Sequence, residues 1–272
     1  MISILFWNLK TLDRGEVCCR LIQRWGIDVL VLAECRDPIS ILKEINPVGQ
    51  RPEFLAFAKK QGNRISIFAR RDQFVFDEIE STRYATALSI RRMRSLPITL
   101  IGTHLPSKTI SRVEKEQPKR IRELSRWIQM IEVRVGCLRT ILIGDLNVDP
   151  FEVPVYSDDG LKSVSTRALA NRRISTTPVF YNPMWRFFGD DNPGPAGTYF
   201  DHRSGSQKLY WHMFDQVLLR PALLPCFSDD NLAIITHDGK VELGKGHGFP
   251  DSEVGSDHFP LLIRLDETRI IT

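Results

Sequence analysis

Eight polar side chains, each at or just after the end of an apolar, strand-like run, carry the chemistry that this sequence offers. They are Asn8, Glu34, His104, Asp145, Asn147, Asp215, Asp257 and His258. Their carboxylate and carboxamide oxygens suit a hard divalent cation such as Mg²⁺ or Mn²⁺, whereas zinc would use more His or Cys ligands. A hard cation, a carboxylate that activates water and an imidazole near the leaving oxygen together equip a site to hydrolyse a phosphate ester.

The run from Thr140 to Asn147 shows the pattern best. Its aliphatic residues predict a buried strand that passes Gly144 and then presents Asp145 and Asn147. Alternation places these two side chains on one face of an extended segment, and open α/β sheets carry their chemistry at the carboxyl ends of strands. A lone Asp-x-Asn is also typical of an Asx-turn after a strand. The functional interpretation is favoured because five further apolar runs end in the same way.

The remaining elements read as a mixed α/β chain. Helices are expected over Arg14–Trp25, from Asp37-Pro38 to Ile45, and after the capping box Ser111-x-x-Glu114, with Pro118 kinking the last helix or marking its true first turn. Four successive strand candidates between residues 53 and 90 have no helix between them, so antiparallel pairs and mixed sheets are expected. Residues from Val148 to Trp211 read as a long irregular insertion.

Composition sets wide limits. The chain has 272 residues, 42% hydrophobic and 26% charged, with a net charge of +4 that permits an anionic substrate. No repeat or linker divides it, so one domain over residues 1–272 is expected. Neither a G-x-x-x-x-G-K-[ST] loop nor a G-x-G-x-x-G loop is present to support nucleotide-driven or hydride chemistry. An odd number of cysteines (five) without metal-type pairs, and the absence of a membrane-spanning run or a signal peptide, predict a cytoplasmic location.

The ordered polar string resembles a known family, the endonuclease/exonuclease/phosphatase superfamily, whose fold is that of DNase I. The resemblance is carried by Trp7-Asn8, Leu32-Ala33-Glu34, Thr103-His104, Gly144-Asp145-Leu146-Asn147, Phe214-Asp215-Gln216-Val217 and Gly255-Ser256-Asp257-His258. It implies a four-layer α/β sandwich, in which two mixed β-sheets pack face to face with helices on the outside. It also implies a Mg²⁺-dependent phosphoesterase, with Mn²⁺ as a possible substitute.

The resemblance assigns a metal side to the site. It implies that Glu34 is the principal Mg²⁺ ligand, that Asn8 lies beside it and that Asp257 completes the set. A strand-end salt bridge is the plainer role for Glu34, but an acid behind five apolar residues needs a partner, and a cation suits it better.

The resemblance also assigns catalytic roles. It implies that Asp145 orients and activates the attacking water and that Asn147 holds a phosphate oxygen. His258 faces the scissile phosphate with Asp215 behind it, fixing its tautomer and raising its basicity. His104 corresponds to a second histidine near the leaving group.

One position departs from the pattern. Several repair nucleases of the family carry an acid two residues after the first-strand Asn, and this chain has Lys10 there. The departure argues against a ligand at this point and against close kinship with abasic-site endonucleases. A solvent-facing Lys10 is expected, with a contact to substrate phosphate as the alternative.

The variable loops are expected to select the substrate. Tyr199, Trp185 and Arg186 are candidates for stacking on unpaired bases and meeting phosphate, although packing over the core edge accounts for most aromatic residues of this insertion. The basic positions that flank the His104 loop could guide a polyanion: Lys108, Arg112, Lys115, Lys119, Arg120 and Arg122. Interspersed glutamates make a solvated helix face an equal alternative.

Three functions follow from these assignments. The first is a nuclease acting on DNA or RNA by in-line attack of an activated water, with nucleic acid as partner. The second is a phosphatase or phosphodiesterase of small or lipid phosphates, such as inositol phosphates. An inactive binding module is disfavoured, because every acid and histidine of the string is present.

Overall fold

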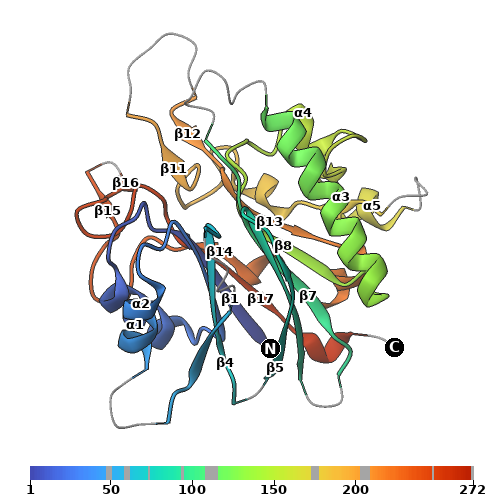
Figure 1. The fold of residues 1–272 in the computed structure, drawn as a ribbon. Helices are drawn as coiled ribbons and strands as arrows, with labels where there is room; N and C mark the ends of the chain where they lie inside the picture. Colours follow the sequence, from blue (N-terminus) through green and yellow to red (C-terminus); the bar gives the residue numbers. More distant parts are fainter. Residues whose placement is uncertain are drawn as a thin grey trace.

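Two mixed β-sheets packed face to face form the centre of the molecule, and helices cover both outer faces (Figure 1). The computed structural model describes residues 1–46, 51–57, 62–72, 74–92, 95–107, 116–172, 178–202, 209–246 and 248–270. The layers are α1 and α2, the first sheet, the second sheet, and α3 with its neighbours. This arrangement confirms the predicted four-layer α/β sandwich.

The first sheet has six strands. Their order is β14 (Leu232–Ile234), β17 (Leu261–Leu265), β1 (Ile2–Asn8), β2 (Val29–Ala33), β4 (Ile65–Arg70) and β3 (Phe54–Phe57). Only β1 and β2 run parallel, joined by α1 (Gly15–Trp25), and the other pairs are antiparallel. The strand β1 therefore lies inside the sheet, with β17 on one side and β2 on the other.

The second sheet has seven strands. Their order is β5 (Phe74–Ser81), β6 (Ala85–Arg92), β7 (Ile98–His104), β8 (Thr140–Asp145), β13 (Asp215–Leu219), β10 (Phe180–Tyr181) and β9 (Ser163–Val164). The parallel pair β7 and β8 is joined by α3 (Gln117–Val135). Two small hairpin sheets, β11 (Tyr199–Phe200) with β12 (Trp211–His212) and β15 (Gly244–Lys245) with β16 (Phe249–Pro250), complete the strands.

Short elements fill the remaining chain. They are α2 (Pro38–Ile45), α4 (Val153–Tyr156), α5 (Arg167–Asn171), η1 (Pro183–Phe187), η2 (Pro221–Cys226), η3 (Asp229–Asn231) and η4 (Glu267–Arg269). The insertion from Val148 to Trp211 is thus less irregular than expected, because it adds two strands to the edge of the second sheet. The predicted capping box at Ser111 lies outside the described residues, and Pro118 sits in the first turn of α3, as one of the two expectations had it. No helix in the described ranges has the length and apolar composition needed to cross a bilayer.

Side-chain alternation in the central strands separates two kinds of core. Ile4 and Phe6 of β1 pack in the cluster between the sheets, while Leu5 and Trp7 pack against the α1 and α2 layer. In β8, Ile141 and Ile143 face the other sheet. Continuing the same alternation by two residues places Asn8 and Asp145 on the inter-sheet face, where their strands end. The polar residues therefore cap one end of the inter-sheet core.

Gly144 allows β8 to lie against β7 just before this polar end. Its φ of 155° is unfavourable for other residues, and a Cβ there would lie 2.0 Å from the carbonyl oxygen of Thr103. The close approach brings the next residue, Asp145, into register with His104 of the neighbouring strand.

We expect Gly144→Ala to lower the free energy of unfolding by about 2 kcal/mol or more, because backbone must move to admit the methyl group. Gly194→Ala is the matched control, since a Cβ at Gly194 meets only the side chain of Asn192, at 3.5 Å. Urea unfolding of both variants measures the difference. Equal stabilities of the two variants would contradict the close packing of β7 and β8.

Candidate active site

Three adjacent strands of the second sheet bring His104, Asp145 and Asp215 into one row. The parallel register of β7 and β8 pairs His104 with Asp145, and the antiparallel register of β8 and β13 pairs Asp145 with Asp215. His258 reaches this row from the loop before β17, and its Nδ1 lies 2.8 Å from Oδ2 of Asp215. Ligand-type atoms of Asp145, Asp215 and His258 all lie within 4.8 Å of one another.

The His258–Asp215 pair is held from both sheets. The indole Nε1 of Trp7, in the first sheet, donates to the carbonyl oxygen of His258 at 2.8 Å. Thr198 supports the other partner, since its Oγ1 accepts from the backbone N–H of Asp215 at 3.2 Å. Both partners are almost completely buried. The imidazole is therefore fixed in position before any substrate arrives.

The pKa values of His258 and Asp145 are both raised, which keeps the first group protonated and brings the pKa of the second close to neutrality. Burial alone lowers the pKa of His258, but the adjacent, hydrogen-bonded Asp215 carboxylate, with Asp145 and Asp257, raises that pKa to about 10. Burial and then the Asp215 carboxylate raise the pKa of Asp145 to about 7, against the lowering effect of His258 and of the hydrogen bond from Asn8. His258 is thus an imidazolium at neutral pH, and Asp145 exchanges a proton near neutrality.

The first sheet contributes the predicted metal side. Asn8 Nδ2 donates to Asp145 Oδ2 at 2.9 Å. Glu34 Oε1 lies 3.4 Å from His104 Nε2, and that nitrogen lies 3.8 Å from Asp145 Oδ2. Asn8, Glu34, His104 and Asp145 therefore form a continuous group across the two sheets, as the sequence predicted.

Backbone strain is concentrated at this end of the molecule. The non-glycine residues with positive φ in the described ranges are Lys10 (50°), Thr11 (60°), Glu34 (50°), Asn147 (53°) and Lys162 (53°). All except Lys162 lie directly after the strands that end at the site. Strained residues of this kind persist where surrounding structure holds them, often at functional sites.

The residues present suit a hard divalent cation. The carboxylate of Asp145 is buried beside a second carboxylate, and Oδ1 of Asp215 has no hydrogen-bond partner within the described part of the chain. Glu34 is a third acid in the group and is one-third exposed, so an incoming ion can reach it. A cation here would relieve an excess of buried negative charge with the oxygen ligands that Mg²⁺ and Mn²⁺ prefer.

His104 is neutral in this environment. Burial, then Arg64 and His258, lower the pKa of its imidazole to about 3. A neutral ring can donate one hydrogen bond and orient its neighbours. The position of His104 near the leaving group stays a prediction.

Asn147 lies in an Asx-turn just after β8 rather than in an extended strand. β8 ends at Asp145, whose Oδ1 accepts from the backbone N–H of Asn147 at 2.8 Å. The side-chain Nδ2 of Asn147 donates to the carbonyl oxygen of Leu105 at 2.9 Å. The Asx-turn interpretation of the Asp-x-Asn run is therefore confirmed, and the functional interpretation stays a prediction.

Lys10 is 51% exposed, as expected of a solvent-facing side chain, but its ammonium also has an acidic partner. Its Nζ lies 2.8 Å from Oδ2 of Asp257, the third predicted metal ligand. No local pattern predicts this pair, because its members are 247 positions apart and lie in loops after β1 and before β17. The structure therefore gives Asp257 a cationic partner of its own within the chain.

The predicted substrate residues divide into two groups. The ring of Tyr199 lies 4.9 Å from the His258 ring and stacks on Phe214 at 5.5 Å. Trp185 instead packs against Phe188, and Arg186 donates to the carbonyl oxygen of Asp229, so the contacts seen in the described chain join neither of them to the site.

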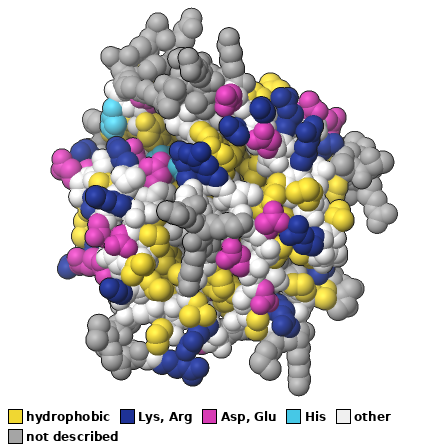
Figure 2. Space-filling model, viewed as in Figure 1, with side chains coloured by type: hydrophobic (Ala, Val, Ile, Leu, Met, Phe, Trp, Pro, Cys, Tyr) yellow, Lys and Arg dark blue, Asp and Glu magenta, His cyan; other side chains and the backbone are white. Residues whose placement is uncertain are grey.

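The predicted basic guide is described only in part. Lys108, Arg112 and Lys115 lie outside the described residues. On α3, Arg120 pairs with Glu116 and Glu123, and Arg122 lies near Asp159. Figure 2 shows Lys and Arg side chains interspersed with Asp and Glu side chains over this part of the surface. These contacts favour the solvated helix face over a basic guide.

A second histidine–carboxylate pair, not found in the sequence, adjoins the site. Asp149 accepts from the backbone N–H of Met213 at 2.7 Å and lies 2.8 Å from Nδ1 of His212. The His212 ring stacks on Phe214 at 4.5 Å. Asp149 follows Asp145 and Asn147 in the same polar run after β8, which was the available signal, whereas nothing local marked His212.

Solved structures give the class of fold. The endonuclease domain of TRAS1, a telomere-specific non-LTR retrotransposon, has a TM-score of 0.60 and 14% identity, covering 97% of this chain and 98% of that one. D. rerio TDP2, complexed with single strand DNA product, has a TM-score of 0.60 and 16% identity over 96% and 97% of the two chains. The 3′ phosphatase NExo from Neisseria, bound to product DNA hairpin, has a TM-score of 0.55 and 15% identity, covering 98% of this chain and 100% of that one.

Comparison at the level of sequence finds no matching family model and no matching curated protein. The structural likeness extends over nearly the whole chain, and it shows that this chain has the fold of the endonuclease/exonuclease/phosphatase superfamily. The resemblance drawn from the ordered polar string is thereby confirmed for the fold.

We expect the His258–Asp215 pair to make stability depend on pH in a defined window. The folded-state pKa of about 10 lies above the ordinary value of 6.5, so the pair's contribution is complete below pH 6.5 and is lost as the pH rises towards 10. Urea unfolding of metal-free protein between pH 6 and 10 should show the free energy of unfolding falling across this range.

Asp215→Asn should flatten that slope, and His202→Gln, at a histidine outside the group, should leave it unchanged. The comparison uses slopes rather than absolute stabilities, because the buried Asp215 also supports the fold. A wild-type slope retained in Asp215→Asn would show that His258 titrates without its partner.

Proposed function

We propose that this chain is a divalent-metal-dependent phosphodiesterase that hydrolyses nucleic acid. The observation that carries the proposal is the buried Asp145 carboxylate, with its pKa near 7, placed between an imidazolium–carboxylate pair and the Glu34–Asn8 edge of the other sheet. A proton acceptor, a fixed positive charge and a cation site around one point are what in-line attack of water on a phosphodiester requires.

Asp145 is the group that orients and deprotonates the attacking water. Its pKa of about 7 lets it accept a proton near neutral pH, and the hydrogen bonds from Asn8 and Asn147 fix its carboxylate plane. Asn147 is proposed to donate to a phosphate oxygen, because its Nδ2 uses one hydrogen for the carbonyl oxygen of Leu105 and has a second hydrogen to offer.

His258 is proposed to stabilise the negative charge that develops on the phosphate. With a pKa of about 10 it stays protonated, and Asp215 holds Nδ1 so that Nε2–H points away from the pair. This arrangement makes His258 a hydrogen-bond donor to the substrate and leaves the role of base to Asp145.

Glu34 and Asn8 are proposed to hold the metal ion, Mg²⁺ or alternatively Mn²⁺, beside Asp145. When bound, such an ion neutralises charge on the phosphate and lowers the pKa of bound water. Asp257 is a weaker candidate, because Lys10 already lies against it.

Nucleic acid is the favoured substrate for two reasons. Tyr199 is partly exposed beside His258 and continues into a series of stacked rings through Phe214 to His212, a surface suited to an unpaired base. Two structural neighbours, TDP2 and NExo, are described with single strand DNA product and with product DNA hairpin.

The five free cysteines fit a reducing compartment, and a cytoplasmic location is part of the proposal.

A substrate panel tests the proposal. Labelled single- and double-stranded DNA, RNA, phosphoinositides and soluble inositol phosphates are incubated with the protein in Mg²⁺ and in EDTA. We expect Mg²⁺-dependent cleavage of a nucleic acid, and a loss of at least about 10³-fold in Glu34→Gln and in Asp145→Asn.

Glu123→Gln, on the outer face of α3, is the matched control and should keep wild-type activity. Circular dichroism confirms that each variant is folded. Turnover confined to inositol phosphates would reject nucleic acid, and full activity of either site variant would reject the assignment of the site.

We expect Tyr199→Ala to raise KM for a single-stranded oligonucleotide about tenfold while changing kcat less, because loss of one stacking surface costs about 1–3 kcal/mol per base. Tyr156→Ala, at an exposed tyrosine of α4, is the control. Steady-state kinetics on the oligonucleotide and on bis(p-nitrophenyl) phosphate, which has no base, separates stacking from chemistry. An equal KM effect on both substrates would argue against a base-stacking role.

A further inference from the structure

The carboxylate of Asp257 already has partners on both oxygens. Oδ2 lies 2.8 Å from the ammonium of Lys10, and Oδ1 accepts from the hydroxyl of Ser256 at 3.3 Å. The contrast with Asp215 is direct, since Oδ1 of that buried carboxylate has no partner in the described structure. Unbalanced negative charge therefore lies on the Asp145 side of the site and not on the Asp257 side.

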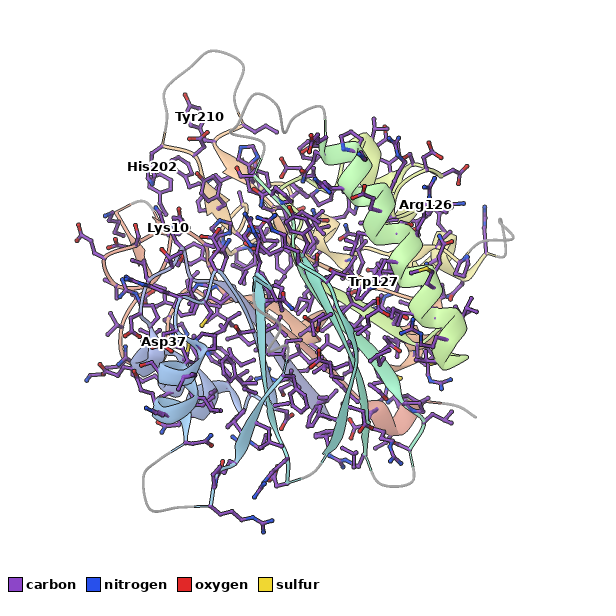
Figure 3. All side chains as sticks on the ribbon, viewed as in Figure 1. Lys10, Asp37, Arg126, Trp127, His202 and Tyr210 are labelled. Atoms are coloured by element: carbon purple, nitrogen blue, oxygen red, sulfur yellow. The ribbon has the colours of Figure 1, made fainter. Side chains whose placement is uncertain are left out.

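The loop that carries Lys10 is fixed between the two remaining predicted ligands. The backbone N–H of Lys10 donates to Oδ1 of Asn8 at 3.0 Å, and that of Thr11 donates to the carbonyl oxygen of Glu34 at 3.1 Å. Figure 3 places Lys10 on the same side of the view as His202, away from Trp127 on α3. Movement of this loop would disturb both Asn8 and Glu34.

The conformation of Lys10 indicates that its side chain matters. A φ of 50° is favourable for Gly and tolerated by Asn, but it costs other residues about 1–2 kcal/mol. The chain nevertheless has a long cationic side chain at this position, and its Nζ lies against a carboxylate adjacent to the catalytic histidine. The side chain is half exposed, yet its ammonium is held at 2.8 Å from Asp257 rather than left in solvent.

We propose that the ammonium of Lys10 supplies the positive charge at Asp257 in place of a metal ion, so that the centre binds one divalent cation, held on the Glu34–Asn8 side. This inference rests on the proposed function for the presence of a metal ion. It removes Asp257 from the ligand set and makes Asp257 a positioning residue that holds Lys10 beside His258. Positive charge on this side of the site is then independent of the metal concentration.

Direct binding of Mn²⁺ tests the inference without substrate. Electron paramagnetic resonance of free Mn²⁺ during titration gives the number of ions per chain and their affinity. We expect one ion in the wild type, an affinity within about threefold of wild type in Asp257→Asn, and an affinity at least about tenfold weaker in Glu34→Gln. Lys10→Asp should bind a second ion, because it places two carboxylates where one ion pair stood, and the double variant K10D/D257N should return to one ion.

A second lysine–aspartate pair provides matched controls. Lys245 and Asp251 lie 3.0 Å apart, and the lysine is 53% exposed against 51% for Lys10. Lys245→Asp and Asp251→Asn should leave both the stoichiometry and the affinity for Mn²⁺ unchanged. Any shift in Lys10→Asp beyond these controls is then specific to the site rather than to surface charge.

Three results would overturn the inference: two ions in the wild type, a loss in Asp257→Asn as large as that in Glu34→Gln, or a single ion in folded Lys10→Asp. These differ from failure of the proposed function, which is absence of phosphodiester cleavage by the wild type. A protein that binds one ion but cleaves no phosphodiester would reject the proposed function and leave the assignment of Lys10 unchanged. A protein that binds two ions and cleaves a phosphodiester would reject the assignment of Lys10 and leave the proposed function unchanged.

Discussion

A carboxylate buried at the meeting point of two sheets is the constraint on which the rest of the site depends. Asp145 is 1% exposed, and such a group is unfavourable unless hydrogen bonds and charges surround it. Its partners come from both sheets: Asn8 from the first, and His258 with Asp215 from the loop and strand beside it. The ends of β1, β8 and β13 must therefore coincide, and this requirement fixes how the sheets align.

The same arrangement gives His258, His104 and Asp145 different protonation states. His258 holds its proton because a buried carboxylate lies behind it, whereas burial, then Arg64 and His258, lower the pKa of His104 and keep that ring neutral. The pKa of Asp145, about 7, lies between those of the two histidines. The difference arises from neighbours rather than from residue type, so two histidines of one site carry different protonation states at the same pH.

Much of the fold was predictable from the sequence, because strand alternation and the polar end of each apolar run are local signals. Asn8, His104, Asp145 and Asp215 were all found in this way, and the structure places them together. Pairs that form only through the tertiary fold were not predictable. Lys10 meets Asp257 across 247 positions, and His212 meets Asp149 across 63. The neutral state of His104 likewise depends on burial and on Arg64, which no neighbouring residue in the sequence reveals.

The pairing of β1 with β17 has a consequence for biosynthesis. Residues 2–6 hydrogen-bond with residues 261–265, and Trp7 secures the backbone of His258. At about 5–20 residues per second, the early strand waits on the order of tens of seconds on the ribosome before its partner emerges. Until then one edge of a very apolar strand is unpaired, so the nascent chain depends on protection from association at that edge. The native arrangement of the site can arise only when the late segment closes the sheet.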